Sequence, residues 1–171
     1  MVFKNLAEKR FTVRKFTDRI VEKEKLELIL EAGNMAPTAK NQQPQKIYVL
    51  QSEEAIEKLS ELTPCGYGAK TIFIFAYDKN EEWKNPLVEG ESSGIEDVSI
   101  VATYMMLQAA ELGLHTCWVN FFSHNKLEEA FNLPKDEKIL LIMPIGYAPE
   151  GTVPFPTHTK KKNLDKIVKY I

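Results

Sequence analysis

Apolar residues recur along this chain at spacings that distinguish helices from strands. Leu26, Ile29 and Leu30 lie at helical spacing, which predicts a helix from about Glu22 to Ala32 with Gly33 at its end. Capping residues and the same apolar spacing predict further helices over residues 5–9, 53–62, 95–112 and 123–133. Runs of β-branched and aromatic residues predict strands over residues 46–51, 71–77, 116–121 and 138–147.

The segment 71–77 is the most strand-like part of the chain. Its residues, TIFIFAY, form a continuous β-branched and aromatic run, which is typical of a central strand covered on both faces. The polar stretch 78–94 that follows is expected to be a mobile loop.

Two segments predict contact with another subunit. Apolar residues cover nearly the whole circumference of the helix over 95–112, and a chain of this size rarely hides such a helix completely. A Pro-rich stretch over 149–156 then leads to an amphipathic tail that contains Leu164, Ile167 and Val168. Such a tail needs an apolar partner, and a neighbouring subunit is the expected one.

Length and composition are those of a globular protein. The chain has 171 residues, of which 44% are hydrophobic and 27% charged, and we expect a single domain over 1–171 with a sizeable core. The formal net charge of −2 argues against a nucleic-acid partner, because no domain-wide positive field is present to neutralise phosphates.

The predicted location is the cytoplasm. Cys65 and Cys117 are the only cysteines, too few for a disulfide scaffold, and a reducing compartment is the simplest setting. Residues 1–5 lack the apolar run of a signal peptide, and no stretch is long and apolar enough to span a bilayer. Neither export nor membrane contact is therefore expected.

Arg10, Thr12 and Arg14 are the first candidate binding residues. Alternate side chains of an extended backbone share a face, so two cations and a hydroxyl project together while Phe11 and Val13 point inward. Such a face suits an oxyanion, since a guanidinium grips a phosphate through two charge-assisted hydrogen bonds. The alternative is an edge strand with solvated charges, and this motif alone does not decide between the two.

The loop between Pro37 and Pro44 is the second candidate. Its polar side chains are Thr38, Asn41, Gln42 and Gln43. An amide side chain offers a donor and an acceptor together, which matches the alternating N–H and C=O edge of a pyrimidine-like ring. Loops of this composition are also common as plain connections between a helix and a strand.

Other chemistries find little support in the sequence. Gly66 and Gly68 lack the third glycine and the strand-to-helix setting of a dinucleotide fingerprint, and neither a P-loop nor a G-x-S-x-G sequence is present. His115 and Cys117 have no further ligands at a recognised spacing, so no metal site is expected. We identify no catalytic side chain, which fits an enzyme whose cofactor carries the electrons.

Segments taken in order along the chain carry a family resemblance. They are Arg-x-Thr-x-Arg at 10–14, Ala36-Pro37-Thr38-x-x-Asn41-x-Gln43-Pro44, LGLHTCW at 112–118, and Pro144-Ile145-Gly146-Tyr147. In order and spacing they resemble the nitroreductase family of FMN-dependent oxidoreductases, over almost the whole chain. The resemblance implies an α+β, three-layer fold in which helices flank a central, mostly antiparallel sheet. It also implies an intertwined homodimer, whose tail over about 152–171 reaches over the partner subunit.

The resemblance further implies an FMN site that two subunits share. On one subunit the phosphate and ribityl chain would be held by Arg10, Phe11, Thr12 and Arg14, with added positive charge from Lys161 and Lys162. The other subunit would contact the isoalloxazine ring through Pro37, Thr38, Ala39, Asn41 and Gln43. The backbone of Val119 and Asn120 would face the reactive edge of the ring, where the family often has an acidic residue followed by glycine.

The implied activity is that of an NAD(P)H-dependent flavin oxidoreductase. NADH or NADPH would deliver hydride to the flavin and leave, and a nitroaromatic or quinone-like electron acceptor would take its place. One alternative is a flavin-binding carrier or sensor without turnover, which the short chain and the Val119-Asn120 pair favour. Another is an enzyme on the same scaffold that dehalogenates or cleaves its ligand.

Overall fold

The computed structural model describes residues 3–171; Met1 and Val2, part of the stretch predicted to carry no export signal, lie outside the described residues. The elements in chain order are α1 (Phe3–Lys9), α2 (Lys23–Asn34), the 3₁₀ turn η1 (Ala39–Asn41), β1 (Gln45–Leu50), α3 (Glu53–Leu62), β2 (Thr71–Asp78), α4 (Gly94–Glu111), β3 (His115–Thr116), α5 (His124–Ala130), β4 (Glu137–Gly146) and the 3₁₀ turn η2 (Leu164–Lys166). Across 3–171, no helix combines the length and the apolar character needed to cross a bilayer.

The strands form one antiparallel sheet in the order β1-β2-β4-β3. In register, Ile47 of β1 lies opposite Phe75 of β2, and Phe73 of β2 lies opposite Met143 of β4. The residues of β2 from Thr71 to Ala76 are all buried, so the predicted central strand covered on both faces is confirmed.

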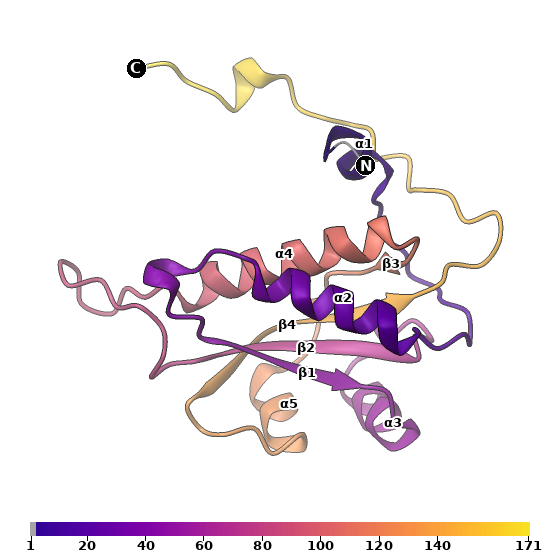
Figure 1. Ribbon diagram of the computed structural model, residues 1–171, viewed down its shortest axis with the longest axis horizontal. Coiled ribbons are helices and arrows are strands. Elements are labelled where there is room, and N and C mark those ends of the chain that lie inside the picture. The colour runs from indigo at the N-terminus through magenta and orange to yellow at the C-terminus, as the bar shows by residue number, and fades with distance from the viewer. Residues whose placement is uncertain (1–2) are drawn as a thin grey trace.

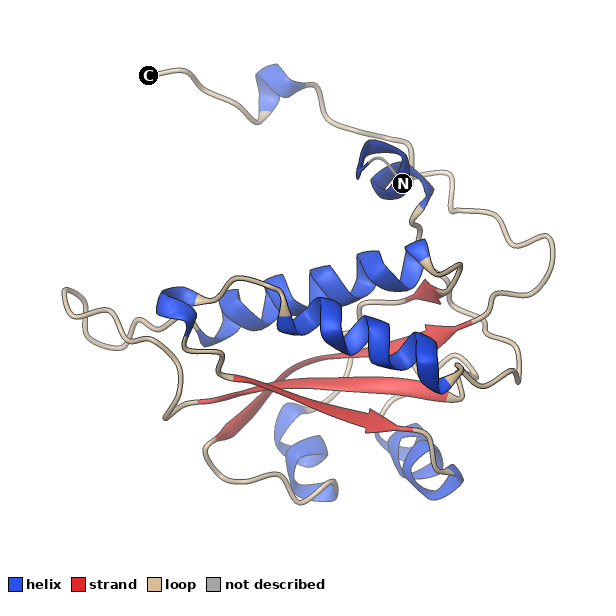
Figure 2. Cartoon of the chain, in the orientation of Figure 1, coloured by secondary structure: helices blue, strands red, loops and turns tan. Residues whose placement is uncertain are grey.

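Helices cover both faces of the sheet and make three layers. Figure 1 shows α2 and α4 packed together on one face, and α3 and α5 on the other. Because successive side chains of β2 alternate, Phe73 and Phe75 enter the core under α2 and α4, while Ile72 and Ile74 enter the opposite core. The predicted three-layer α+β fold is thus confirmed (Figure 2), whereas the intertwined dimer remains a prediction.

The contact between α2 and α4 corrects the predicted helix end at Gly33. The helix continues to Asn34 and buries Gly33 against α4. A Cβ at position 33 would lie 2.7 Å from Met105 Sδ, closer than van der Waals contact allows. Gly33 therefore lets two helices approach each other, a role that the local sequence does not distinguish from helix termination.

The strand predicted over 116–121 is wrong in extent. β3 consists of His115 and Thr116 only, and the chain meets β4 again at Val119, which forms an isolated bridge with Ile142. The intervening Cys117 N–H donates to the carbonyl of Pro144 at 3.1 Å. The segment thus follows β4 without forming a regular ladder.

Two helix boundaries also differ from the prediction. The helix predicted over 123–133 ends at Ala130, because Asn132 adopts a left-handed φ of 52°. Phe3 and Lys4 already belong to the first helix, so Asn5 lies inside it and does not cap it. The predicted helix over 53–62 is confirmed, with Ser52 accepting a hydrogen bond from Ala55 N–H at 3.2 Å.

Inside one chain, α4 is buried on one face only. Val98, Val101 and Met105 are fully buried, while Ile95 is 56% exposed and Tyr104 is 42% exposed. This chain therefore covers only part of the apolar circumference of α4, and the expected second subunit remains a prediction.

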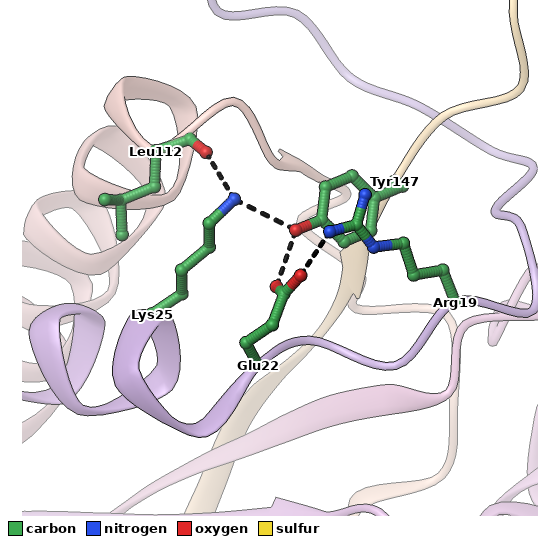
Figure 3. Close-up of polar contacts among 5 residues, drawn as sticks. All are labelled: Arg19, Glu22, Lys25, Leu112 and Tyr147. Carbon is green, nitrogen blue, oxygen red and sulfur yellow. Dashed lines mark hydrogen bonds and ion pairs between the residues drawn. The ribbon is translucent and has the colours of Figure 1, made fainter.

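A polar cluster ties the start of α2 to the ends of α4 and β4 (Figure 3). Lys25 Nζ donates to the Tyr147 hydroxyl at 2.9 Å and to the Leu112 carbonyl at 3.1 Å. The Tyr147 hydroxyl donates to Glu22 Oε2 at 2.6 Å, and Arg19 pairs with the same carboxylate. The Arg19 guanidinium carbon also lies 3.9 Å from the centroid of the Tyr147 ring. The cluster fixes the chain where it enters α2.

Acid is expected to remove the contribution of this cluster to stability. Hydrogen bonds from Tyr147 and the backbone, together with Arg19, lower the pKa of Glu22 from 4.5 to about 2. A carboxylate with a lowered folded-state pKa stabilises the fold above its unfolded pKa, and this stabilisation is lost as pH falls toward the folded value. Glu22→Gln is expected to be less stable than wild type at pH 7 and equally stable near pH 2, in urea unfolding across this range.

Glu24→Gln provides the matched control, because Glu24 lies in the first turn of α2 with an exposed side chain. Its stability is expected to follow that of wild type at each pH. If Glu22→Gln is less stable than wild type by the same amount at every pH down to 2, the charge of the Glu22 carboxylate is not the source of the difference.

Candidate functional site

The segment 10–14 lies against the β3 edge of the sheet. Thr12 forms a single parallel bridge with Thr116, and Val13 N–H donates to the Thr116 carbonyl at 3.2 Å. Val13 is 2% exposed, whereas Arg14 is exposed. The predicted alternation of inward and outward side chains therefore holds around this bridge, although the segment does not form a full strand.

Phe11 packs between two histidine rings. Its ring centroid lies 5.0 Å from that of His115 and 6.2 Å from that of His158, both edge to face. Burial lowers the pKa of His115, so this ring is neutral at neutral pH. His115 therefore adds no positive charge beside Phe11.

The two candidate arginines are not neutralised by the rest of the chain. Arg10 is half-buried and has no hydrogen bond or ion pair from its side chain within residues 3–171, and Arg14 has no carboxylate partner there. The Arg14 guanidinium lies over the Phe155 ring, 5.4 Å from its centroid. Its neighbours Tyr67 and Cys117 are uncharged, because burial raises the pKa of Tyr67 to about 12 and also raises that of Cys117. The arrangement leaves two cations available to an anion.

The C-terminal segment crosses this corner of the molecule. Phe155 lies under Arg14, and the His158 ring Nε2 is 3.1 Å from the Glu8 carbonyl oxygen. Lys161 Nζ donates to the His158 carbonyl at 3.0 Å, and Lys161 lines a hollow of about 690 Å³ between this segment and α1. Lys162 is exposed, with no side-chain partner in the described part of the chain. Of the two predicted lysines, the structure ties only Lys161 to this corner.

The loop from Pro37 to Gln43 adopts a strained conformation. Lys40, Asn41 and Gln43 have positive φ values of 50°, 55° and 53°. Each such residue other than glycine costs about 1 kcal/mol or more. Gln43 N–H donates to Thr38 Oγ1 at 3.0 Å inside the loop. The loop exposes the side chains of Asn41 and Gln43 to solvent.

Val119 and Asn120 have distinct roles in the fold. Val119 is 4% exposed and belongs to the core on the α3 and α5 side. The Asn120 side chain donates through Nδ2 to the Leu140 carbonyl at 2.9 Å and accepts at Oδ1 from Trp118 Nε1 at 2.8 Å. The side-chain amide of Asn120 thus forms hydrogen bonds within the chain both as a donor and as an acceptor.

The structure brings some predicted site residues together and separates others. Segment 10–14, Val119 and Asn120 lie along β3 and its extension, and Lys161 lies close by. The loop 37–43 is fixed to Asp97 in the first turn of α4, whereas segment 10–14 pairs with Thr116 beyond its last turn. α4 itself, 18 residues from Gly94 to Glu111, is roughly 27 Å long at 1.5 Å per residue. The loop also enters β1, the edge strand opposite β3 (Figure 1).

Sequence reasoning missed Asp97 and Ser93. Asp97 is 3% exposed and Ser93 is 4% exposed, and Asp97 Oδ1 accepts a hydrogen bond from Ala39 N–H at 2.8 Å. The sequence does carry one signal for Asp97, an acidic residue on the apolar face of a helix. A carboxylate buried there needs hydrogen-bond partners from elsewhere in the fold. Within the predicted loop 78–94, Trp83 is half-buried at the base of a hairpin whose tip carries Leu87.

Comparison with known proteins identifies the family to which this fold belongs. The model of the nitroreductase family matches residues 7–67 and 64–147. A crystal structure of a nitroreductase family protein from Clostridium difficile 630 superposes with a TM-score of 0.91 at 40% identity, covering 99% of this chain and 98% of that one.

Two further proteins are similar over most of this chain. The FMN-dependent nitroreductase from Clostridium difficile R20291 has a TM-score of 0.75 and 29% identity, over 94% of this chain and 99% of its own. An FMN reductase [NAD(P)H] from Bacillus subtilis is 30% identical over 151 residues, 78% of this chain and 60% of its own. With a family match over most of its length and the same fold, the chain belongs to the nitroreductase family.

Proposed function

We propose that this protein is an FMN-dependent oxidoreductase that works as a homodimer, with each FMN held between two subunits. The observation that carries the proposal is the position of two incomplete half-sites, one cationic and one rich in amides, at opposite corners of one chain. NADH or NADPH is the proposed electron donor, and a nitroaromatic or quinone-like compound is the proposed acceptor.

The cationic half-site fits the phosphate of FMN. Arg10 and Arg14 are free of carboxylate partners within the described chain, and Thr12 adds a hydroxyl between them. Guanidinium groups bind phosphate with charge-assisted hydrogen bonds, which are about twice as strong as neutral ones. Lys161, which lines the hollow beside α1, would supply further positive charge. These residues would hold the phosphate and orient the ribityl chain.

The amide half-site fits the edge of the flavin ring. Thr38 and Asn41 project from a loop whose strained backbone is fixed by internal hydrogen bonds. An amide side chain can both donate to and accept from the alternating groups of the pyrimidine edge. Pro37 and Ala39 would provide the apolar contacts to the ring, and the exposed Gln43 would add a second amide.

A second copy of the chain brings the half-sites together. One chain separates them by roughly the length of α4, about 27 Å for this helix at 1.5 Å per residue. The outer face of α4 exposes Ile95 and Tyr104, and the tail exposes Phe155, Leu164 and Ile167. Exposed apolar side chains grouped on one helix face and along a tail are typical of interfaces between subunits. We therefore expect the tail over about 152–171 to cover the partner subunit.

The proposed chemistry belongs to the cofactor, and the chain provides binding and orientation. When bound, FMN takes up hydride from a nicotinamide donor and passes electrons to the acceptor. Arginine and lysine side chains would hold its phosphate, and Tyr67, whose pKa burial raises to about 12, adds no negative charge beside them. The backbone at Val119 and Asn120 would face the reactive edge of the ring. Hydrogen bonds with the Ile142 backbone fix Val119, and bonds of the Asn120 side chain to Trp118 and Leu140 fix Asn120.

The visible spectrum tests this proposal directly. Purified protein mixed with FMN and then separated from free ligand is expected to carry a flavin absorption band, and anaerobic addition of NADH or NADPH is expected to bleach it. Protein that retains no FMN would reject the proposed cofactor. Protein that binds FMN without being bleached by either nucleotide would favour the carrier or sensor instead.

A further inference from the structure

We infer that Asp97 is a positioning residue, which holds the loop 37–43 in the conformation that binds FMN; the inference rests on the proposed function. Asp97 does not project into the site itself. It acts through Ala39, whose backbone N–H donates to Asp97 Oδ1 at 2.8 Å.

The burial of Asp97 indicates a specific role. A carboxylate that is 3% exposed has lost its water, and such a group is retained where hydrogen bonds replace its hydration. Asp97 forms no ion pair with any residue of the described chain, and its place in the first turn of α4 puts it at the positive end of the helix dipole. Its second oxygen, Oδ2, accepts from the Ser93 hydroxyl at 2.7 Å.

The loop depends on this bond because of its own backbone. Lys40, Asn41 and Gln43 are all left-handed, a conformation that persists only when surrounding contacts fix it. Bonds from Asn41 N–H to the Thr38 carbonyl and from Gln43 N–H to Thr38 Oγ1 are internal to the loop. The bond from Ala39 to Asp97 is the one that joins its interior to another element of the described structure.

Ser93 extends the same junction to the neighbouring hairpin. Its hydroxyl accepts from Trp83 N–H at 3.2 Å, and its own N–H donates to the Trp83 carbonyl at 2.9 Å. The pair of Asp97 and Ser93 thus joins the loop 37–43, the start of α4 and the base of the hairpin 83–93. Loosening Asp97 is expected to free the loop while leaving the distant cationic half-site unchanged.

Two measurements on Asp97→Ala test the inference. In the protein without FMN, the amide of Ala39 is expected to exchange hydrogen faster than in wild type, while the amides of Val101 and Met105 in α4 keep their protection. The dissociation constant for FMN is expected to rise about 10- to 100-fold, as for the loss of one hydrogen bond to a charged group. A residue that merely stabilised α4 would change exchange along the helix instead.

Conservative and control variants sharpen the result. Asp97→Asn keeps an oxygen that can accept from Ala39 N–H, and it is expected to restore most of the affinity. Glu96→Ala removes the exposed neighbouring carboxylate and is expected to behave as wild type. If Asp97→Ala does not fold, Ser93→Ala serves in its place. The dissociation constant for FMN is then expected to rise about 3- to 10-fold, because Asp97 loses one of its two hydrogen-bond partners.

The outcomes separate the inference from the proposed function. Wild-type protein that binds FMN while Asp97→Ala, or Ser93→Ala in its place, binds it equally well would overturn the inference alone. Faster exchange at Ala39 with unchanged affinity would overturn it as well. Wild-type protein that binds no FMN would overturn the proposed function and the positioning role together.

Discussion

Replacing Arg10 and Arg14 together with alanine is expected to weaken FMN binding by about 10²- to 10⁴-fold, the result of losing two charge-assisted contacts. Both guanidinium groups lack carboxylate partners within the described chain, so their removal leaves no buried counter-charge behind. The fold should therefore tolerate the change. Titration of flavin fluorescence measures the affinity, and urea unfolding in the absence of FMN checks stability.

A double variant of the flanking lysines is the matched control. Lys9→Ala with Lys15→Ala removes the same net charge from the same stretch, at two exposed side chains. Exposed charges act at a distance through screened electrostatics, so the affinity is expected to fall only a few-fold at physiological salt. Equal losses in both double variants would mean that Arg10 and Arg14 contribute general attraction and do not contact the phosphate.

Elements that depend on local pattern could be predicted from the sequence. The buried run at 71–77 and the amphipathic segment at 53–62 carry their own periodicity, and both fold as predicted. The alternation around Thr12 likewise follows from an extended backbone, since Val13 is buried while Arg14 is exposed. In each case the deciding interaction lies within a few residues along the chain.

Features that depend on distant partners could not be predicted in this way. Gly33 ends no helix, because its place is set by Met105, which comes from another helix. Asp97 looks like an ordinary acidic residue of a first helical turn until Ala39 is placed beside it. The separation of the two half-sites follows from the strand order, with β1 and β3 at opposite edges.

The same separation leads to the second large prediction, that two defective chains together form an intact site. One chain would carry Arg10→Ala and Arg14→Ala, and the other Thr38→Ala and Asn41→Ala. The second change removes two neutral hydrogen-bonding groups and is expected to weaken FMN binding about 10- to 100-fold in its own homodimer. In a mixed dimer, one site combines both defects, while the other combines the intact arginines of one chain with the intact loop of the other.

Mixed dimers isolated through two different affinity tags are therefore expected to bind about one FMN per dimer with wild-type affinity, because a two-fold symmetric dimer has two equivalent sites and the mixture restores one. The matched control joins wild-type chains that carry the same two tags, and it should show both sites. A mixed dimer without any tight site would mean that each chain supplies its own complete pocket. That outcome conflicts with the geometry, because within one chain loop 37–43 is bonded to Asp97 in the first turn of α4, whereas segment 10–14 pairs with Thr116 of β3, beyond the last turn of that helix.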